Sequence, residues 1–137
     1  MNSQIIIDTG PLVAFLNKRD NYHSWADFQL GFVSNQLVTC EAVITETCFL
    51  LRNIPKGQET VFELLKRGLI KIDFNIESEV ETISKLMKKY KDVPISLADA
   101  CLIKMSEQIK NSIVITLDSD FRLYRKNRVN VIPTIMP

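Results

Sequence analysis

The sequence has few cysteines and histidines, which excludes several common kinds of site. Its three cysteines are odd in number, and no two form a Cys-x-x-Cys pair. Disulfide frameworks and structural zinc sites depend on such pairs, so we expect reduced thiols buried in the core and a protein of the cytoplasm. His23 is the only histidine. We expect it to be solvated or to pack against a helix, and not to act as a general base.

Long apolar runs and an excess of one charge are also missing. No stretch approaches the roughly 20 apolar residues that a membrane-spanning helix needs, and the N-terminus lacks a cationic segment before a long apolar one. We therefore expect no membrane contact. The net charge is only +1, which argues against a strong non-specific nucleic-acid binder. It does not argue against a small local basic patch.

Apolar β-branched runs alternate with longer amphipathic stretches along the 137 residues. This length predicts one domain, residues 1–137. Strands are expected at 5–7, 37–40, 69–74, 113–117 and 129–132. Helices are expected from Pro11 onward, at 24–34, 41–52, 59–67 and 77–90, from Ser96 onward, and at 121–126. Strand alternating with helix predicts an α/β fold, with a mostly parallel sheet covered by helices on both faces.

Four acids stand among apolar neighbours: Asp8, Glu46, Asp99 and Asp118. Two follow apolar strand runs, and the other two share helix faces with apolar residues three or four positions away. An acid in such surroundings costs free energy unless a cation pairs with it. No lysine or arginine occupies a matching inward position, so the pattern predicts a divalent cation bound by oxygen ligands. Sites in open parallel sheets form at the carboxyl ends of the strands, where these acids can converge.

The segments that carry these acids resemble the motifs of the PIN-domain nucleases. They are Ile-Ile-Ile-Asp8-Thr9-Gly-Pro-Leu, Ala-Val-Ile-Thr45-Glu46-Thr, Ser96-Leu-Ala-Asp99-Ala and Ile-Thr116-Leu-Asp118-Ser-Asp120-Phe121. Each motif is short, but all four occur in the family's order and span nearly the whole chain. The resemblance implies a three-layer α/β/α sandwich with a mostly parallel central sheet. It also implies a metal-dependent endoribonuclease, with Mg²⁺ or Mn²⁺ as cofactor and RNA as substrate. Many similar proteins are the toxin of a VapBC-type toxin–antitoxin pair and have an antitoxin protein as partner. The resemblance also implies that the nuclease is often a homodimer.

The resemblance also suggests roles for single residues. We expect Asp8, Asp99 and Asp118 to be catalytic metal ligands, directly or through water. Glu46 is either a further ligand or the residue that orients the attacking water. Asp120 is a candidate for a second metal ion or for the fourth acid, although the motif alignment favours Asp118.

Polar and basic residues near the acids are candidates for binding the substrate. Thr9 and Thr116 offer hydroxyl groups that can orient a carboxylate or a phosphate. Arg122 and Arg125 belong to a basic cluster just after the fourth motif. This cluster either contacts phosphate groups of the substrate or is an ordinary charged surface patch. The lysines between positions 85 and 91 are expected to form a solvated helix face.

Other interpretations remain for several of these residues. Asp8 can simply cap the following helix, and Asp99 lies in a first helical turn with Ser96 as N-cap. The tripeptide Asp8-Thr9-Gly10 also occurs in aspartic proteases, but these need paired β-rich lobes, and the alternation of helix with strand in this chain excludes that interpretation. Aspartyl phosphatases need a second acid where this chain has Gly10. A PIN-like nucleic-acid-binding or RNA-processing protein without catalysis or a toxin role is the alternative function.

Three aromatic residues at helical spacing remain to be placed. They are Trp25, Phe28 and Phe32, in the helix expected at 24–34. We expect them first in the core or in a dimer interface, and only second as surfaces on which bases stack.

Overall fold

A parallel five-stranded sheet forms the centre of the computed structural model, which describes residues 3–137. Its strands are β1 (Gln4–Ile7), β2 (Leu37–Thr39), β3 (Ile70–Ile72), β4 (Ser112–Ile115) and β7 (Thr134–Ile135). They lie in the order β3-β2-β1-β4-β7, and all neighbouring pairs are parallel. A separate antiparallel hairpin joins β5 (Arg125–Lys126) to β6 (Asn130–Val131).

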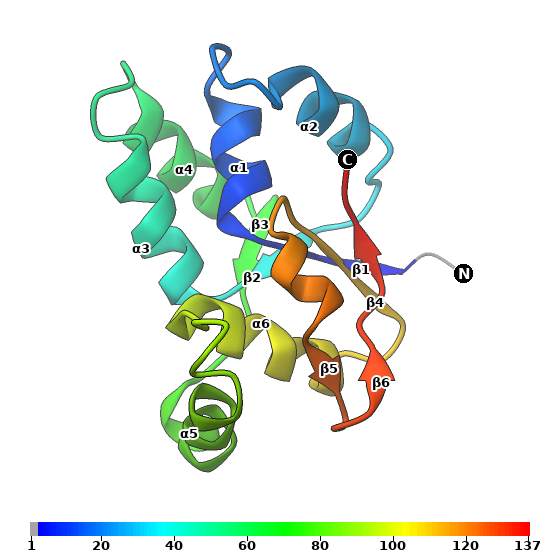
Figure 1. Cartoon of the computed structure of the whole chain (residues 1–137). Helices are drawn as coiled ribbons and strands as arrows, with labels where there is room; N and C mark the ends of the chain where they lie inside the picture. Colours follow the sequence, from blue (N-terminus) through cyan, green and yellow to red (C-terminus); the bar gives the residue numbers. More distant parts are fainter. Residues whose placement is uncertain (1–2) are drawn as a thin grey trace.

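Helices cover the sheet on both sides. They are α1 (Thr9–Leu16), α2 (His23–Leu30), α3 (Glu41–Leu50), α4 (Gly57–Lys66), α5 (Val80–Lys89) and α6 (Leu97–Gln108), with short 3₁₀ turns η1 (Glu77–Glu79) and η2 (Ser119–Arg122). Figure 1 shows α1 to α4 on one side of the sheet and α5 and α6 on the other. The predicted α/β/α architecture with a parallel sheet is therefore confirmed. No helix within residues 3–137 is both long enough and apolar enough to cross a membrane.

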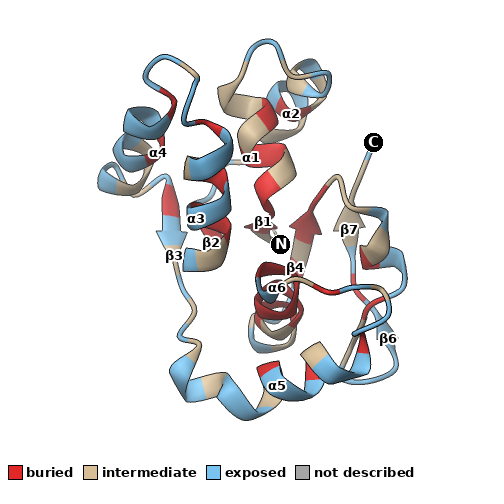
Figure 2. Cartoon of the chain, turned by 60° about the vertical axis from the view of Figure 1, so that its left-hand side comes forward, coloured by how far each residue is buried: buried red, intermediate tan, exposed pale blue. Residues whose placement is uncertain are grey.

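The central strands and α6 form the middle of the core. Ile6 and Ile7 of β1 pair with Val114 and Ile115 of β4, and all four side chains are buried. Such continuous apolar runs are typical of parallel strands covered on both faces. Helix α6 packs on both strands, and most of its residues are buried (Figure 2). This packing fixes the start of α6 relative to the ends of β1 and β4.

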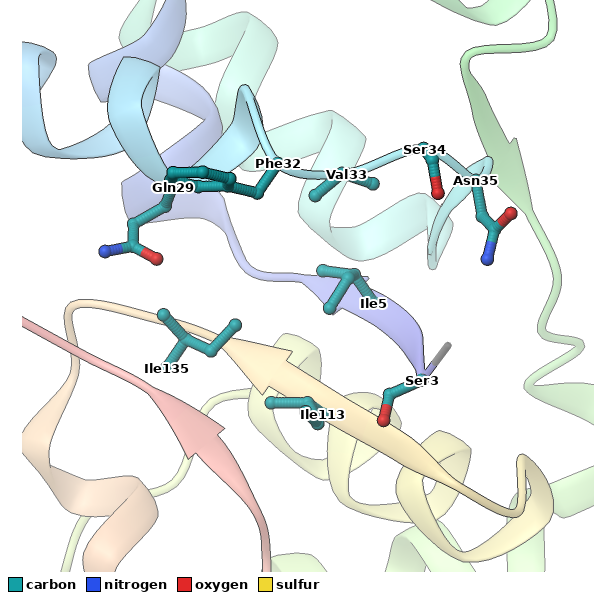
Figure 3. Close-up of a pocket in the computed structure, with 9 residues that line it drawn as sticks. All are labelled: Ser3, Ile5, Gln29, Phe32, Val33, Ser34, Asn35, Ile113 and Ile135. Carbon is teal, nitrogen blue, oxygen red and sulfur yellow. The ribbon is translucent and has the colours of Figure 1, made fainter. Parts of the chain in front are cut away.

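The segment around α2 differs from its prediction. The helix ends at Leu30. Of the aromatic side chains expected in the core, Trp25 packs against it, whereas Phe28 is 63% exposed and Phe32 is 73% exposed. Their rings contact each other edge to face instead. The chain after α2, from Phe32 to Asn35, lines a cavity together with residues of the sheet. Figure 3 shows this cavity of about 310 Å³ over β1, β4 and β7. Interface roles for these aromatics stay a prediction.

The last twenty residues also differ from their prediction. The helix expected at 121–126 is only the 3₁₀ turn η2, followed by β5. Asp118 caps this turn, and left-handed backbone at Asn127 and Arg128 then reverses the chain into the hairpin. Of the strand expected at 129–132, only β6 is present, and the strand that joins the main sheet is β7. Neighbouring residues could not signal this, because the left-handed positions are not glycines.

Candidate active site

The four predicted acids line one open pocket at the carboxyl edge of the sheet. Asp8 follows β1, and its backbone N–H donates to the carbonyl of Ile115 at the end of β4, at 3.0 Å. Glu46 comes from α3, the helix after β2, and Asp99 comes from the first turn of α6. The pocket has a volume of about 420 Å³. Its lining residues are Asp8, Thr9, Gly10, Glu46, Pro94, Ser96, Asp99, Leu117, Asp118 and Asp120.

Asp8 is buried, and each of its carboxylate oxygens accepts one hydrogen bond. Its Oδ1 accepts from the backbone N–H of Thr9 at 2.7 Å, and its Oδ2 accepts from the Thr116 hydroxyl at 2.7 Å. Only 7% of the residue is exposed. Asp8 is also the N-cap of α1. The capping role and the place in the pocket are therefore properties of the same side chain.

Asp99 is held by a residue that sequence reasoning missed. The hydroxyl of Tyr124 donates to Asp99 Oδ2 at 2.9 Å, and the Ser96 hydroxyl accepts from the Asp99 backbone N–H at 3.0 Å, as expected for an N-cap. Tyr124 is fully buried, with its ring packed edge to face against Tyr90 and Phe121. The only hint in the sequence was the apolar spacing of Phe121 and Tyr124. The contact with Asp99 spans 25 residues.

Glu46 corrects one expectation about the acids. It is exposed, whereas the apolar spacing around it had placed it on an inward helix face. Leu50, one of the residues used in that argument, is itself 53% exposed, so this face of α3 borders open pocket and not core. The Thr9 hydroxyl donates to Glu46 Oε1 at 2.6 Å and ties it to the start of α1.

Asp118 and Asp120 lie together at the other rim of the pocket. Both are half-buried, and Asp118 Oδ1 accepts from the backbone N–H of Asp120 at 2.9 Å. Partial burial and the neighbouring charge of Asp118 raise the pKa of Asp120. Both carboxylates thus remain available at one pocket, and the choice between them as fourth acid stays open.

The two threonines expected to bind substrate donate hydrogen bonds to the acids. Thr116 is fully buried, and its hydroxyl donates to Asp8 while accepting from the backbone N–H of Asp118 at 2.9 Å. The hydroxyl of Thr9, which is also buried, donates to Glu46. In the structure they orient carboxylates, which is one of the two uses expected for their hydroxyl groups, and contact with the substrate stays a prediction.

The arginines expected to bind phosphate lie outside the lining of the pocket. Nη1 of Arg125 donates to the carbonyls of Arg122 and Tyr124, at 2.7 and 2.9 Å. Arg122 is exposed. Neither guanidinium therefore neutralises the acids, and any contact with phosphate has to occur beside the pocket.

The histidine and the cysteines lie away from the pocket. Nδ1 of His23 is 2.8 Å from the carbonyl of Ala14, so this ring links α2 to α1. Cys40 and Cys101 are buried in the core and Cys48 is half-buried, all as free thiols. These placements agree with the structural roles expected for them.

The pocket carries uncompensated negative charge. Within residues 3–137, all ion pairs lie elsewhere, and none involves Asp8, Glu46, Asp99, Asp118 or Asp120. Burial, with the charges of Asp99 and Glu46 adding to it, raises the pKa of Asp8 to about 7. Burial and the charges of Asp118 and Glu46 raise the pKa of Asp99 to about 6. Crowded carboxylates repel one another in this way, and a bound cation would relieve the repulsion.

The acids do not form a closed ligand set. In the described part of the chain, no three histidine, cysteine, aspartate or glutamate side chains are grouped closely enough to hold a metal ion by themselves. This does not conflict with Mg²⁺, which is usually bound through one or two carboxylates and keeps several water molecules. An open pocket with carboxylates on several sides has the donor chemistry for such an ion.

Comparison with known proteins places the chain in a family and agrees with the fold. The family model for the PIN domain matches residues 5–127. The chain is 25% identical over 135 residues to Ribonuclease VapC26 of Mycobacterium tuberculosis, covering 94% of this chain and 100% of that protein. It also resembles the crystal structure of Mycobacterium tuberculosis VapC20, described as a sarcin-ricin loop cleaving toxin. That likeness has a TM-score of 0.79 at 19% identity, over 95% of this chain and 100% of the other, and concerns the fold.

Asp8→Asn should flatten the pH dependence of stability in EDTA. Because burial raises the folded-state pKa of Asp8 from 3.8 to about 7, its contribution to stability is fully present below about pH 4. That contribution is lost as the pH rises through about 7. We expect this residue alone to lower the free energy of unfolding of the wild type by roughly 2–4 kcal/mol over that range. Urea unfolding at several pH values measures it, and equal pH slopes for the two proteins would contradict it.

Tyr124→Phe should raise the pKa of Asp99 further while leaving the fold intact. The phenol donates a hydrogen bond that favours the charged carboxylate, and the variant removes only this donor. Titration of the Asp99 carboxyl carbon by NMR measures the pKa directly. Tyr90→Phe is the matched control, since its hydroxyl accepts from the Arg125 backbone N–H and does not contact Asp99. An unchanged Asp99 titration in Tyr124→Phe would show that the phenol does not stabilise the carboxylate.

Proposed function

The chain belongs to the PIN domain family, and we propose that it is a Mg²⁺- or Mn²⁺-dependent endoribonuclease. The observation that carries this proposal is the pocket in which five acids meet with no cation beside them. Hydrolysis of a phosphodiester needs an activated water molecule and neutralisation of the phosphate charge. Carboxylates without a cationic partner, gathered at the functional edge of a parallel sheet, suit a divalent ion that provides both.

We assign the metal to Asp8, Asp99 and Asp118, directly or through water. When bound there, Mg²⁺ or Mn²⁺ lowers the pKa of a coordinated water and offsets the charge of the scissile phosphate. Each of these carboxylates has an oxygen fixed by a neighbouring donor: Thr116 for Asp8, Tyr124 for Asp99, and the Asp120 backbone N–H for Asp118. Such donors hold the ligands in place before the ion arrives and reduce the cost of reorganisation.

Glu46 has a different task in this proposal. It is exposed at the rim, and the Thr9 hydroxyl fixes its Oε1. Its other carboxylate oxygen is therefore available to orient the attacking water and accept its proton. Asp120, also at the rim, supports Asp118 or a second ion.

We further propose that the protein is the toxin of a VapBC-type pair. The support is the named function of its relatives: one is called a ribonuclease, and the other is described as a toxin that cleaves the sarcin-ricin loop. RNA is then the substrate and an antitoxin protein is the partner. A homodimer and a place in the cytoplasm belong to the same proposal. Expression of the wild type should arrest growth, and Asp8→Asn should not. Normal growth with active enzyme in the cell would favour an RNA-processing role.

Asp8→Asn should reduce RNA cleavage by at least about 100-fold, because losing one ligand misplaces the shared ion. Structured and single-stranded RNAs are incubated with each protein at equal Mg²⁺ or Mn²⁺, and again with EDTA. Asp99→Asn and Asp118→Asn should behave like Asp8→Asn, and Asp120→Asn should be milder. His23→Ala is the control, since this ring packs between helices and should leave the rate nearly unchanged. Equal cleavage by the wild type and Asp8→Asn, or cleavage that survives EDTA, would contradict the proposal.

A further inference from the structure

A second pocket, distinct from the acidic one, lies between α5, α6 and the β5–β6 hairpin. It is a groove with a volume of about 450 Å³. Its charged lining consists of Lys85 and Lys89 from α5, Lys104 and Glu107 from α6, and Arg125 and Arg128 from the hairpin. Figure 2 shows α5 running along the bottom of the molecule toward this hairpin. The groove thus joins two basic stretches that are about 40 residues apart in sequence and had been interpreted separately.

Most of the positive charge in this basic groove is uncompensated. Lys104 is neutralised, because its Nζ lies 3.9 Å from Glu79 and 3.5 Å from Glu107. In the described part of the chain, the other four cations of the groove have no carboxylate within ion-pair distance. A chain with a net charge of only +1 therefore concentrates positive charge in one concave place. A polyanion is the ligand class that such a place favours.

The hairpin holds Arg128 at the groove in an unfavourable backbone conformation. Asn127 and Arg128 have φ angles of 50° and 74°, in the left-handed region that glycine or asparagine usually occupies. Such a conformation costs an arginine of the order of 1 kcal/mol and persists only where the surroundings impose it. Here the Asn127 backbone N–H donates to the Glu107 carboxylate at 2.6 Å. Glycine would adopt this backbone conformation with less strain. An arginine at position 128 is therefore better explained by a use for its side chain than by the backbone.

Two buried tyrosines connect a residue of the basic groove to a residue of the acidic pocket. The backbone N–H of Arg125 donates to the Tyr90 hydroxyl at 3.0 Å, and the Tyr90 ring packs against Tyr124, with centroids 5.0 Å apart. The Tyr124 hydroxyl in turn donates to Asp99. Arg125 of the groove and Asp99 of the pocket are thus separated only by two tyrosines in contact with each other, which places the groove beside the acids.

We propose that the basic groove binds the backbone phosphates of single-stranded RNA that flanks the cleavage site. The inference rests on the proposed function and adds where the substrate is held. It answers a need of that function, because the acidic pocket has no cation in its lining and repels phosphate. Cations beside the pocket then have to supply the grip on the strand. Positively charged grooves that follow the phosphate backbone are typical of proteins that bind single-stranded nucleic acid.

Binding measurements in the Asp8→Asn background with EDTA test this without cleavage. The probe is a fluorescent single-stranded RNA of about 12 nucleotides, followed by anisotropy over a range of salt concentrations. The groove variant adds Lys85→Gln and Lys89→Gln. The matched control adds Lys18→Gln and Lys66→Gln, which remove the same charge from exposed positions. Lys66 lies in the last turn of α4, as Lys89 does in α5, so both variants lose one lysine from a helix end.

The groove variant should bind about tenfold more weakly at low salt, and its slope of log affinity against log salt should be shallower by about 1.4. The control should bind like the parent, and circular dichroism should show that all three are folded. Adding Arg128→Gly should weaken binding further while leaving the melting temperature unchanged or higher, since glycine relieves the strained backbone.

Other outcomes contradict either the groove or the proposed enzyme activity, and they can be told apart. Equal loss in groove and control variants would mean that only overall charge matters. Displacement of the RNA by an acidic peptide of equal charge at equal concentration would assign the groove to an acidic protein partner. If the wild type in Mg²⁺ binds RNA through the groove but does not cleave it, the proposed enzyme activity is contradicted and the groove is supported. RNA binding by the groove variant that equals binding by its Asp8→Asn parent would contradict the groove and leave the proposed enzyme activity untouched.

Discussion

Two carboxylates, Asp8 and Asp99, are buried at one edge of the sheet with no cation beside them. Burial of charge without a partner opposes folding, and like charges add to the penalty. The surrounding structure is arranged around this constraint. Buried donors from Thr9, Thr116 and Tyr124 hold the carboxylate oxygens, and the packing of α6 on β1 and β4 brings the two residues to one place.

The same constraint explains the distribution of charge. The acids face one pocket, while unpaired cations gather in the groove on the far side of the tyrosine pair. The low net charge of the chain thus hides two regions of opposite sign. In the proposed enzyme, these regions divide the work: the acids bind the ion that performs the hydrolysis, and the cations hold the strand. One short segment contributes to both regions: Tyr124 donates a hydrogen bond to Asp99 of the acidic pocket, and the next residue, Arg125, lines the basic groove.

The sequence predicted those features that depend on local pattern. Apolar runs located the central strands, and helical spacing located most helices. The position of Asp8 and Asp118 after apolar strand runs correctly predicted that both line the pocket. Long-range contacts could not be predicted in this way. The exposure of Glu46 depends on what faces α3, and the bond from Tyr124 to Asp99 crosses 25 residues. The C-terminal hairpin depends on left-handed backbone at residues that carry side chains, a choice that local preferences oppose.

Direct measurement of metal binding tests the central claim without RNA. Mn²⁺ is titrated into the wild type, Asp8→Asn, Asp99→Asn and the exposed control Asp27→Asn, and free Mn²⁺ is followed by electron paramagnetic resonance at pH 5.5 and pH 8. The wild type and Asp27→Asn should bind Mn²⁺ at pH 8 and more weakly at pH 5.5, because protons compete for carboxylates with raised pKa values. Asp8→Asn and Asp99→Asn should lose most of this binding. Affinity that is the same in all four proteins, or unchanged between the two pH values, would contradict a metal site at these acids.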